Sequence, residues 1–331
     1  MTLQIIRSAA GTLPLCSYAG AVTERLMLLD TASLYFRAFF GVPDRAKAPD
    51  GSSVNATRGL LDIIAKLVTL YRPSQLVACW DDDWRPQWRV DLIPSYKAHR
   101  VVEQIADAPD VEEVPDALQQ QIPLIREALG VLGIPIIGAA EHEADDVIGT
   151  LATRASLPVD IVTGDRDLFQ LVDDGRDVRV IYTARGMSNL EIVTDETVVA
   201  KYGVLPSQYA DFATLRGDAS DGLPGVKGVG EKTAATLLLS HGDLAGIRAA
   251  AEEGQLTATA ARRFAEASDY LDVAPTVVKV ATDLDISAPG VVLAELDDAA
   301  RDAAEALAER WNLGSSMTRA LGALASAGDA G

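Results

Sequence analysis

The sequence predicts an α/β protein built around a doubly wound, mostly parallel sheet. Short apolar runs alternate with stretches of helical periodicity, and an acidic residue follows several of the runs at once. Such alternation is typical of parallel sheets, in which ligands bind beyond the carboxyl ends of the strands. We expect strands at 26–29, 76–80, 134–137, 159–162 and 178–182, and helices at 54–71, 116–129 and 143–154.

The length and composition favour a globular protein with more than one part. The chain has 331 residues, of which 48% are hydrophobic and 23% charged, so it can bury a core. No stretch approaches the roughly 18 apolar residues of a membrane span. We expect a poorly ordered N-terminal extension over 1–25, an α/β core over 26–205, a helical region over 206–324 and a frayed tail over 325–331.

The charge and the cysteine content exclude several classes of protein. Asp and Glu number 48 against 29 Lys and Arg, which gives a net charge of −19. This balance disfavours a protein that coats duplex DNA or binds membrane surfaces, but it does not exclude an enzyme whose acids bind metal ions. Cys16 and Cys79 are too few for a disulfide framework or a zinc site, so we expect a reducing cytosol.

Seven acidic residues follow predicted strands or open a predicted helix, and two more lie in the segment RGDASDGLPG. A single acid in such a position is usually a turn residue or interacts with a helix dipole. Together, however, like charges at one edge of a sheet would repel each other strongly unless cations bridged them. Oxygen ligands without matching His or Cys select Mg²⁺ or Mn²⁺ over Zn²⁺. The candidate ligands are Asp30, Asp81, Glu143, Asp145, Asp146, Asp165, Asp167, Asp218 and Asp221.

Such a cluster indicates phosphoryl-transfer chemistry. Two ions about 3.5–4 Å apart can activate a water and hold the leaving oxygen of an in-line displacement, as nucleases require. An ATPase or a kinase is not supported, because the sequence has no GxxxxGK[ST] loop and no protein-kinase signature. A phosphatase remains open on the metal cluster alone.

The segment LPGVKGVGEKTAATLL at 223–238 distinguishes between these possibilities. Gly225, Gly228 and Gly230 allow a tight hairpin between two helices, with backbone amides that can face a phosphate. Lys227 and Lys232 add positive charge there. This pattern predicts a helix–hairpin–helix, which binds the DNA backbone without reading sequence, and it favours a nuclease.

Five motifs in order resemble the structure-specific 5′-nucleases, namely the flap endonucleases and the 5′-nuclease domain of bacterial DNA polymerase I. The resemblance runs from about 26 to 284 and includes LLDTASLYFRAFF, IPSYKAHR, EADDVIGTLA, TGDRDLFQLV and GDASDGLPGVKGVGEKTA. The resemblance implies a PIN-like fold for the core. It also implies that the protein is a 5′-3′ exonuclease and flap endonuclease. Such an enzyme would hydrolyse DNA at 5′ flaps, nicks and 5′-tailed duplexes during replication and repair. It also implies a monomer in the bacterial cytosol and nucleoid.

The same resemblance implies residue roles. Asp30, Asp81, Glu143 and Asp145 would hold one metal, and Asp146, Asp165, Asp167, Asp218 and Asp221 would hold or orient the second. Beneath a helical arch at about 85–123, Lys97 and Arg100 would lie near the scissile phosphate and Tyr96 near the terminal base. A K⁺ ion at the hairpin, held by backbone carbonyls, is expected as well.

The sequence departs from the family pattern in three places. Asp82 and Asp83 extend the first acidic site, where the family usually carries small or polar residues. Gly222 stands where the family commonly has Asn. The run after Arg100 is acidic and contains no Lys or Arg before Arg126, so it should repel a threaded strand. Its acids are Glu103, Asp107, Asp110, Glu112, Glu113 and Asp116.

Two other functions compete with a DNA-cleaving enzyme. A paralogue could recognise junctions without cutting them, but the complete set of acids argues against it. A nuclease on a related sheet could cleave RNA, but the helix–hairpin–helix argues against that.

Overall fold

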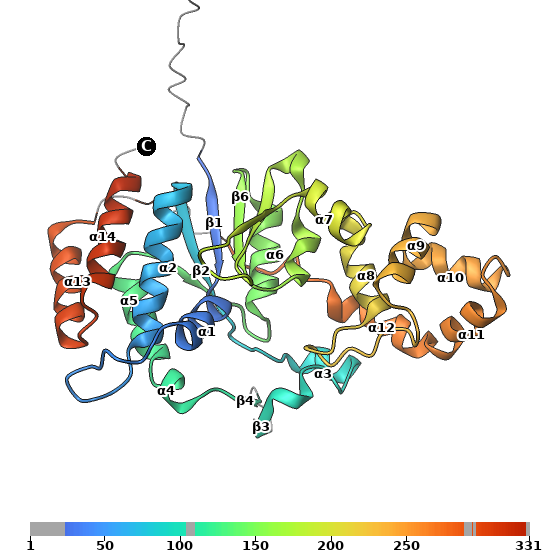
Figure 1. Ribbon diagram of the computed structural model, residues 1–331, viewed down its shortest axis with the longest axis horizontal. Coiled ribbons are helices and arrows are strands. Elements are labelled where there is room, and N and C mark those ends of the chain that lie inside the picture. Colours follow the sequence, from blue (N-terminus) through green and yellow to red (C-terminus); the bar gives the residue numbers. More distant parts are fainter. Residues whose placement is uncertain (1–23, 104–109, 288–292, 294–295, 329–331) are drawn as a thin grey trace, which may run out of the picture.

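The fold was analysed in a computed structural model that describes residues 24–103, 110–287, 293 and 296–328. The molecule is elongated, with a sheet near its middle and helical layers at both ends (Figure 1). Residues 1–23 of the expected N-terminal extension lie outside the described residues. Arg25, the last residue of that extension, pairs with the buried Asp160 at 2.8 Å and so belongs to the core.

The central sheet is doubly wound, as predicted. Its strand order is β5-β2-β1-β6-β7-β8, and every neighbouring pair is parallel except β7 and β8. The edge strand β8 was not predicted, because a strand of three residues is too short to show a period. The strands are β1 (Leu26–Asp30), β2 (Gln75–Cys79), β5 (Ile136–Ile137), β6 (Val159–Thr163), β7 (Val178–Tyr182) and β8 (Glu191–Val193).

Both faces of the sheet are buried, which explains its continuous apolar strands. In β1, Met27 and Leu29 pack on the side of α1 (Thr31–Gly41), α2 (Asn55–Tyr71) and α5 (Ile122–Val131). Leu26 and Leu28 pack on the side of α6 (Ala144–Arg154) and α8 (Tyr209–Arg216). The strand order reverses between β1 and β6, and ligands bind at such a switch point in open α/β sheets.

The helix predicted over 116–129 is divided in two, α4 (Asp116–Gln119) and α5. Between them Gln121 is buried, and its side-chain oxygen accepts hydrogen bonds from the amides of Ala56 (2.9 Å) and Thr57 (3.2 Å). It thereby satisfies free amides in the first turn of α2. This tertiary contact explains the break.

The segment 85–123 was expected to be a helical arch, and only part of it is helical. It contains α3 (Gln87–Leu92), a 3₁₀ turn (Ala98–Arg100) and α4. Between them β3 (Val101–Glu103) and β4 (Val111–Glu112) form an antiparallel pair instead of a helix. The valines in both strands favour extended backbone. Residues 104–109, which include Asp107, lie outside the described residues.

The chain is mainly helical after 206, as predicted. Next to α7 (Asp195–Tyr202), the helices α8 to α12 form one end of the molecule (Figure 1). Two short 3₁₀ segments, Asp167–Leu171 and Asp174–Arg176, follow β6, and a third, Pro206–Gln208, precedes α8. The further helices are α9 (Glu231–His241), α10 (Leu244–Glu252), α11 (Ala258–Glu266) and α12 (Ser268–Val278).

The last two helices correct the expected division of the chain. Helices α13 (Asp298–Arg310) and α14 (Ser315–Gly328) pack against α5 and α2 of the core, at the opposite end from α9 to α11 (Figure 1). Residues 206–324 therefore do not form one unit. The expected frayed tail also begins too early, because α14 continues to Gly328.

Among the helices that the structure describes, none combines the length and the apolar character that crossing a bilayer requires.

Candidate metal-dependent active site

A polar cavity of about 410 Å³ opens at the carboxyl edge of the sheet, beside the switch point. Strands β1 and β6 deliver acids directly to this edge, and the start of α6 faces it. Six of the nine predicted carboxylates line the cavity together with Lys97 and Arg100: Asp30, Asp81, Glu143, Asp145, Asp165 and Asp218.

Asp30 and Asp81 are fixed by hydrogen bonds at the ends of two neighbouring strands. Asp30 caps α1 by accepting from the Ser33 amide at 3.1 Å, and it also accepts from the Thr163 hydroxyl at 2.6 Å. Asp81 accepts from the Ala144 amide at 2.8 Å. Burial raises the pKa of Asp30 to about 6 and the pKa of Asp81 to about 7. The Asp30 carboxylate is buried and the Asp81 carboxylate half-buried, so water stabilises their charge less than it does in free solution.

A second group of acids surrounds Asp165, which follows β6. Burial, and next the charge of Asp165, raise the pKa values of Asp145 and Asp167 well above their usual range. Burial also raises the pKa of Asp221 to about 6, although Lys97 opposes the shift. Asp167 and Asp221 are not among the cavity-lining residues, yet the charge of Asp165 contributes to the raised pKa of both.

Glu143 lies at the start of α6 and is surrounded by donors. Its Oε1 accepts from the Tyr96 hydroxyl at 2.7 Å and from Arg89 Nη1 at 3.1 Å, and its Oε2 forms an ion pair with Lys97. Tyr96 is only 4% exposed. The ring of Tyr96 is therefore packed inside the protein and its hydroxyl holds Glu143, while its expected place near a terminal base stays a prediction.

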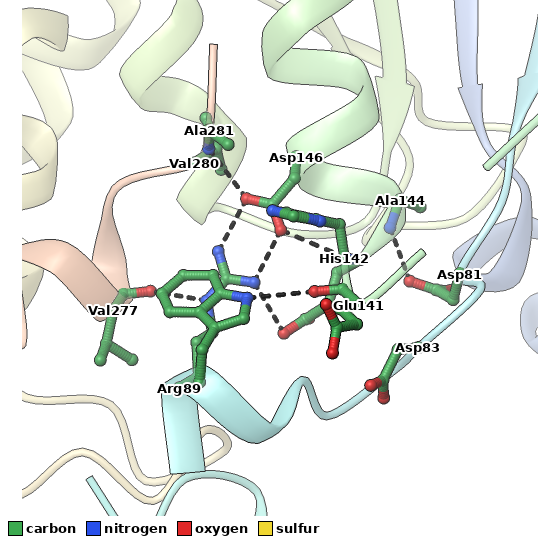
Figure 2. Close-up of polar contacts among 12 residues, drawn as sticks. Asp81, Asp83, Arg89, Glu141, His142, Ala144, Asp146, Val277, Val280 and Ala281 are labelled. Carbon is green, nitrogen blue, oxygen red and sulfur yellow. Dashed lines mark hydrogen bonds and ion pairs between the residues drawn. The ribbon is translucent and has the colours of Figure 1, made fainter. Parts of the chain in front are cut away.

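Asp146 was predicted as a metal ligand, but it does not line the cavity and is paired with an arginine instead. Its two oxygens lie 2.7 Å from Nη1 and Nη2 of Arg89, and Oδ1 also accepts from the Ala281 amide at 2.8 Å (Figure 2). Arg89 further donates to the Val277 carbonyl at 3.1 Å, so it ties α3 to α6 and α12. Burial alone would raise the pKa of Asp146, but Arg89 outweighs it and lowers the pKa. Asp146 is a buried ion-pair partner, which corrects the sequence-based assignment.

The sequence analysis missed Arg89. A lone arginine among the apolar residues of WRVDLI is the one signal that could have pointed to a buried charge.

Arginines also surround Asp218. Arg216 Nη2 lies 3.0 Å and Arg166 Nη2 3.9 Å from its Oδ2, while Oδ1 accepts from the Ser220 amide at 2.9 Å. Arg166 lines the cavity and was not predicted as a site residue. In the sequence it stands between Asp165 and Asp167. Its basic character places positive charge beside the second group of carboxylates.

Two acids of the segment after Arg100 have basic partners, contrary to the expectation of an unpaired acidic run. Glu112 lines the cavity and forms an ion pair with Arg100, and Asp110 forms one with Arg85. Both arginines lie before the acidic run in the sequence, so the run itself could not reveal the pairing.

The predicted hairpin joins α8 to α9. Gly225 has a φ of +63°, and a Cβ atom there would lie 2.5 Å from the Gly217 amide nitrogen, so the turn requires glycine. Gly228 also lies in the turn, whereas Gly230 has an ordinary φ and precedes the first residue of α9. Lys227 and Lys232 are exposed.

The structure explains the unusual Gly222. Its φ is +69°, and a Cβ atom there would lie 2.0 Å from the Ser95 carbonyl oxygen. The loop that carries Tyr96 and Lys97 therefore rests directly on the turn after Asp221. The Lys97 amide donates to the Asp221 carbonyl at 2.9 Å across this contact.

The donor set fits hard divalent cations. In the part of the chain that the structure describes, no three His, Cys, Asp or Glu side chains are gathered tightly enough to hold an ion as they stand. Burial raises the pKa values of Asp81 and Asp145, and Lys97 pairs with Glu143. Because the acids of the cavity offer only oxygen, they would bind Mg²⁺ or Mn²⁺ in competition with protons.

The fold and the cavity define a class, the doubly wound α/β proteins with a carboxylate-lined cavity at the carboxyl edge of the sheet. Similarity to known protein families identifies one family within this class. Residues 25–203 match the family model of the 5'-3' exonuclease N-terminal, resolvase-like domain, and residues 204–300 match the 5'-3' exonuclease C-terminal SAM fold. The chain belongs to the 5'-3' exonuclease family, and the resemblance, the fold class and the enzymatic character predicted from the sequence are confirmed.

Similar proteins extend along most of the chain. It is 60% identical over 299 residues to a 5'-3' exonuclease of Streptomyces coelicolor, covering 89% of this chain and 98% of that protein. A 5'-3' exonuclease of Mycobacterium tuberculosis is 53% identical over 272 residues, covering 79% and 85%. DNA polymerase I of the same species is 44% identical over 223 residues, which span 66% of this chain but 23% of the polymerase.

Solved structures support the fold. The T5 D15 protein co-crystallised with metal ions has a TM-score of 0.60 at 17% identity and covers 91% of this chain and all of that one. The catalytic core of Rad2 in complex with DNA has a TM-score of 0.53 at 19% identity, covering 86% of each chain.

Proposed function

We propose that this protein hydrolyses DNA phosphodiester bonds at 5′ flaps, nicks and 5′-tailed duplexes, by a two-metal-ion mechanism in replication and repair. The observation that carries the proposal is the cavity itself, where seven carboxylates and three basic residues meet at the switch point of the sheet. We further propose that the protein acts as a monomer on chromosomal DNA in the bacterial cytosol.

The carboxylates divide into two sets around the cavity. Bound Mg²⁺ or Mn²⁺ would activate a water and stabilise the leaving oxygen. We assign the first ion to Asp30, Asp81, Glu143 and Asp145. We assign the second to Asp165, Asp167, Asp218 and Asp221.

Lys97 and Arg100 act on the phosphate. Both line the cavity, and both now pair with carboxylates, Lys97 with Glu143 and Arg100 with Glu112. A phosphate entering the cavity offers each of them a second charged oxygen acceptor, and their charge stabilises the negative charge that develops during hydrolysis. Glu143 keeps Lys97 in place until the substrate arrives.

The hairpin between α8 and α9 binds the duplex part of the substrate. Gly225, Gly228 and Gly230 bring backbone amides close to the start of α9, where a phosphate is favoured. The exposed Lys227 and Lys232 add charge, and a K⁺ ion held by hairpin carbonyls completes the contact. These contacts carry no base specificity, so the shape of the DNA would direct cleavage.

Substitution Asp165→Asn tests this function. We expect at least about a hundredfold loss of turnover with nearly unchanged DNA affinity, because the cations act on the transition state whereas binding depends on remote phosphate contacts. The assay compares end-labelled flap, nicked, gapped and blunt duplexes with Mg²⁺ and Mn²⁺. Asp174→Asn, an exposed acid outside the cavity, is the matched control. Normal cleavage by Asp165→Asn would reject the two-metal assignment, and junction binding without cleavage by the unmodified protein would indicate a non-cutting paralogue.

A further inference from the structure

Lys97 has an unusual backbone conformation. Its φ is +47° and its ψ 18°, in the left-handed region that residues other than glycine rarely adopt. Such a conformation persists only where the surrounding structure fixes it. On either side, the Lys97 amide donates to the Asp221 carbonyl at 2.9 Å and the Arg100 amide donates to the Lys97 carbonyl at 3.0 Å.

The preceding peptide is held by a buried guanidinium. Arg85 Nε donates to the Tyr96 carbonyl at 2.5 Å, and Arg85 Nη2 donates to the Pro94 carbonyl at 3.2 Å. The Arg85 side chain therefore donates hydrogen bonds to two carbonyls of the turn just before Lys97. The Arg85 side chain is only 2% exposed.

A buried guanidinium requires an opposite charge. Within the described residues, the acid that forms an ion pair with the Arg85 guanidinium is Asp110, which is itself only 10% exposed. Asp110 immediately precedes β4, so its position depends on the β3–β4 pair. The contacts that hold the Lys97 loop thus include Asp110, a residue of the segment that follows Arg100.

Trp84 also links Asp110 to the loop that carries Lys97. Its indole Nε1 donates to the Asp110 carbonyl at 2.7 Å, and its own carbonyl accepts from Lys97 Nζ at 3.4 Å. The Arg100 guanidinium lies 5.2 Å from the centre of the Trp84 ring. Trp84 and Arg85 therefore contact Asp110 on one side and the basic cavity residues or their loop on the other.

We propose that Asp110 and Arg85 are positioning residues that hold Lys97 in its left-handed conformation, with Lys97 Nζ at the cavity. The inference rests on the proposed function, because it takes Lys97 to act on the scissile phosphate. Neither residue lines the cavity, so both act through the Lys97 loop. The acidic segment accordingly supports cleavage through one of its own carboxylates.

The test is Asp110→Asn, which removes the charge and keeps the shape. At saturating 5′-flap DNA we expect the single-turnover rate to fall between about ten- and a hundredfold, because small displacements of a catalytic group cost this much. The dissociation constant for DNA should stay close to that of the unmodified protein. Because leaving Arg85 buried without its counter-charge lowers stability, the rates are compared well below the melting temperature of the variant, where circular dichroism shows it to be folded. Glu103→Gln, which removes the same charge from an exposed position in β3, is the control and should not slow cleavage. Asp110→Glu, which keeps the charge, should recover most of the rate.

A double-mutant cycle shows whether the effect passes through Lys97. In the Lys97→Ala background, Asp110→Asn should slow cleavage little further, because coupled residues are not additive. An equal loss in both backgrounds, or normal cleavage by Asp110→Asn, would overturn the positioning role. Failure of the proposed function looks different: the unmodified protein would not cleave, or Lys97→Ala would cleave as fast as the unmodified protein.

Discussion

Two neighbouring carboxylates in the first turn of α6 have different surroundings. Asp145 lines the cavity, and its pKa is raised by burial and by the charge of Asp165. Asp146 is fully buried against Arg89. Successive residues of a helix are rotated by about 100°, so adjacent side chains point to different neighbours.

We expect the two Asn substitutions at this pair to separate activity from stability. Asp145→Asn should abolish metal-dependent turnover and leave the fold intact. Asp146→Asn should lower the free energy of unfolding by about 3–5 kcal/mol, because Arg89 would remain buried without its main counter-charge. Denaturant unfolding and turnover of both variants check this, and each is the control for the other. Loss of turnover in a stable Asp146→Asn protein would return Asp146 to the metal site.

The same ion pair predicts a dependence on pH. The pKa of Asp146 is lowered from 3.8 by Arg89 against the effect of burial. Its contribution to stability is therefore complete above pH 3.8 and is lost as the pH falls through the lower pKa of the folded state. Unfolding measured across this acidic range should show a steeper loss for the unmodified protein than for Asp146→Asn. Parallel curves would contradict the assigned pKa shift.

At the scale of elements, the short β3–β4 pair brings acids with different surroundings close together. Glu112 pairs with Arg100 at the cavity, while Glu113 is exposed. The sequence alone treats these two residues as equivalent sources of repulsion toward a threaded strand.

Their Gln variants should therefore differ. Glu113→Gln should speed cleavage of long 5′ flaps at low salt and leave nicked duplex unchanged, because it removes only a screened repulsion toward the single strand. Glu112→Gln should change cleavage of both substrates, since it frees Arg100 inside the cavity. Single-turnover rates on the two substrates at low and physiological salt distinguish the variants. Identical profiles would show that the pairing with Arg100 has no role.

Helix α14 is a second element whose contribution can be measured. Met317 is 1% exposed and packs in the same cluster as α2 and α5. Met317→Ala should lower the free energy of unfolding by about 2–5 kcal/mol through the cavity it leaves, without changing the rate on bound DNA. Thr318→Ala, exposed on the same helix, is the control. An unfolding free energy equal to that of the unmodified protein would mean that α14 is not part of the folded core.

Across the whole molecule, the site lies where the α/β core meets the helical end that carries the hairpin (Figure 1). The carboxylates gathered there are costly to ionise. Burial raises the pKa values of Asp30 and Asp221 to about 6 and that of Asp81 to about 7. Without metal, the stability linked to these groups is complete below their unfolded pKa and is lost as the pH rises through about 6 to 7.

Divalent cations should reverse this loss. We expect Mg²⁺ to raise the melting temperature more at about pH 8 than at about pH 5, because protons neutralise the carboxylates at the lower pH and compete with the metal. Thermal unfolding with Mg²⁺ or with a chelator measures the shift, and Asp145→Asn should reduce it. A shift of equal size at both pH values would show that the cation binds elsewhere.

The sheet, the edge at which the acids meet and the hairpin can all be predicted from the order of the residues. Asp30 and Asp165 follow apolar strand-length runs, and the carboxyl ends of parallel strands must lie at one edge. Gly225 precedes a helix with the spacing of a tight turn. These features depend on local patterns and on the geometry of parallel strands, so they can be predicted from neighbouring residues.

The three-dimensional packing shows which carboxylates line the cavity and which are held by arginines outside it. The partner of Asp146 is Arg89, 57 positions away, and the partner of Asp110 is Arg85. Helix α14 also covers α2 although more than two hundred residues separate them. Such pairings depend on long-range packing, where one buried charge or one apolar face selects its partner by position in space, and no local period of the sequence contains that information.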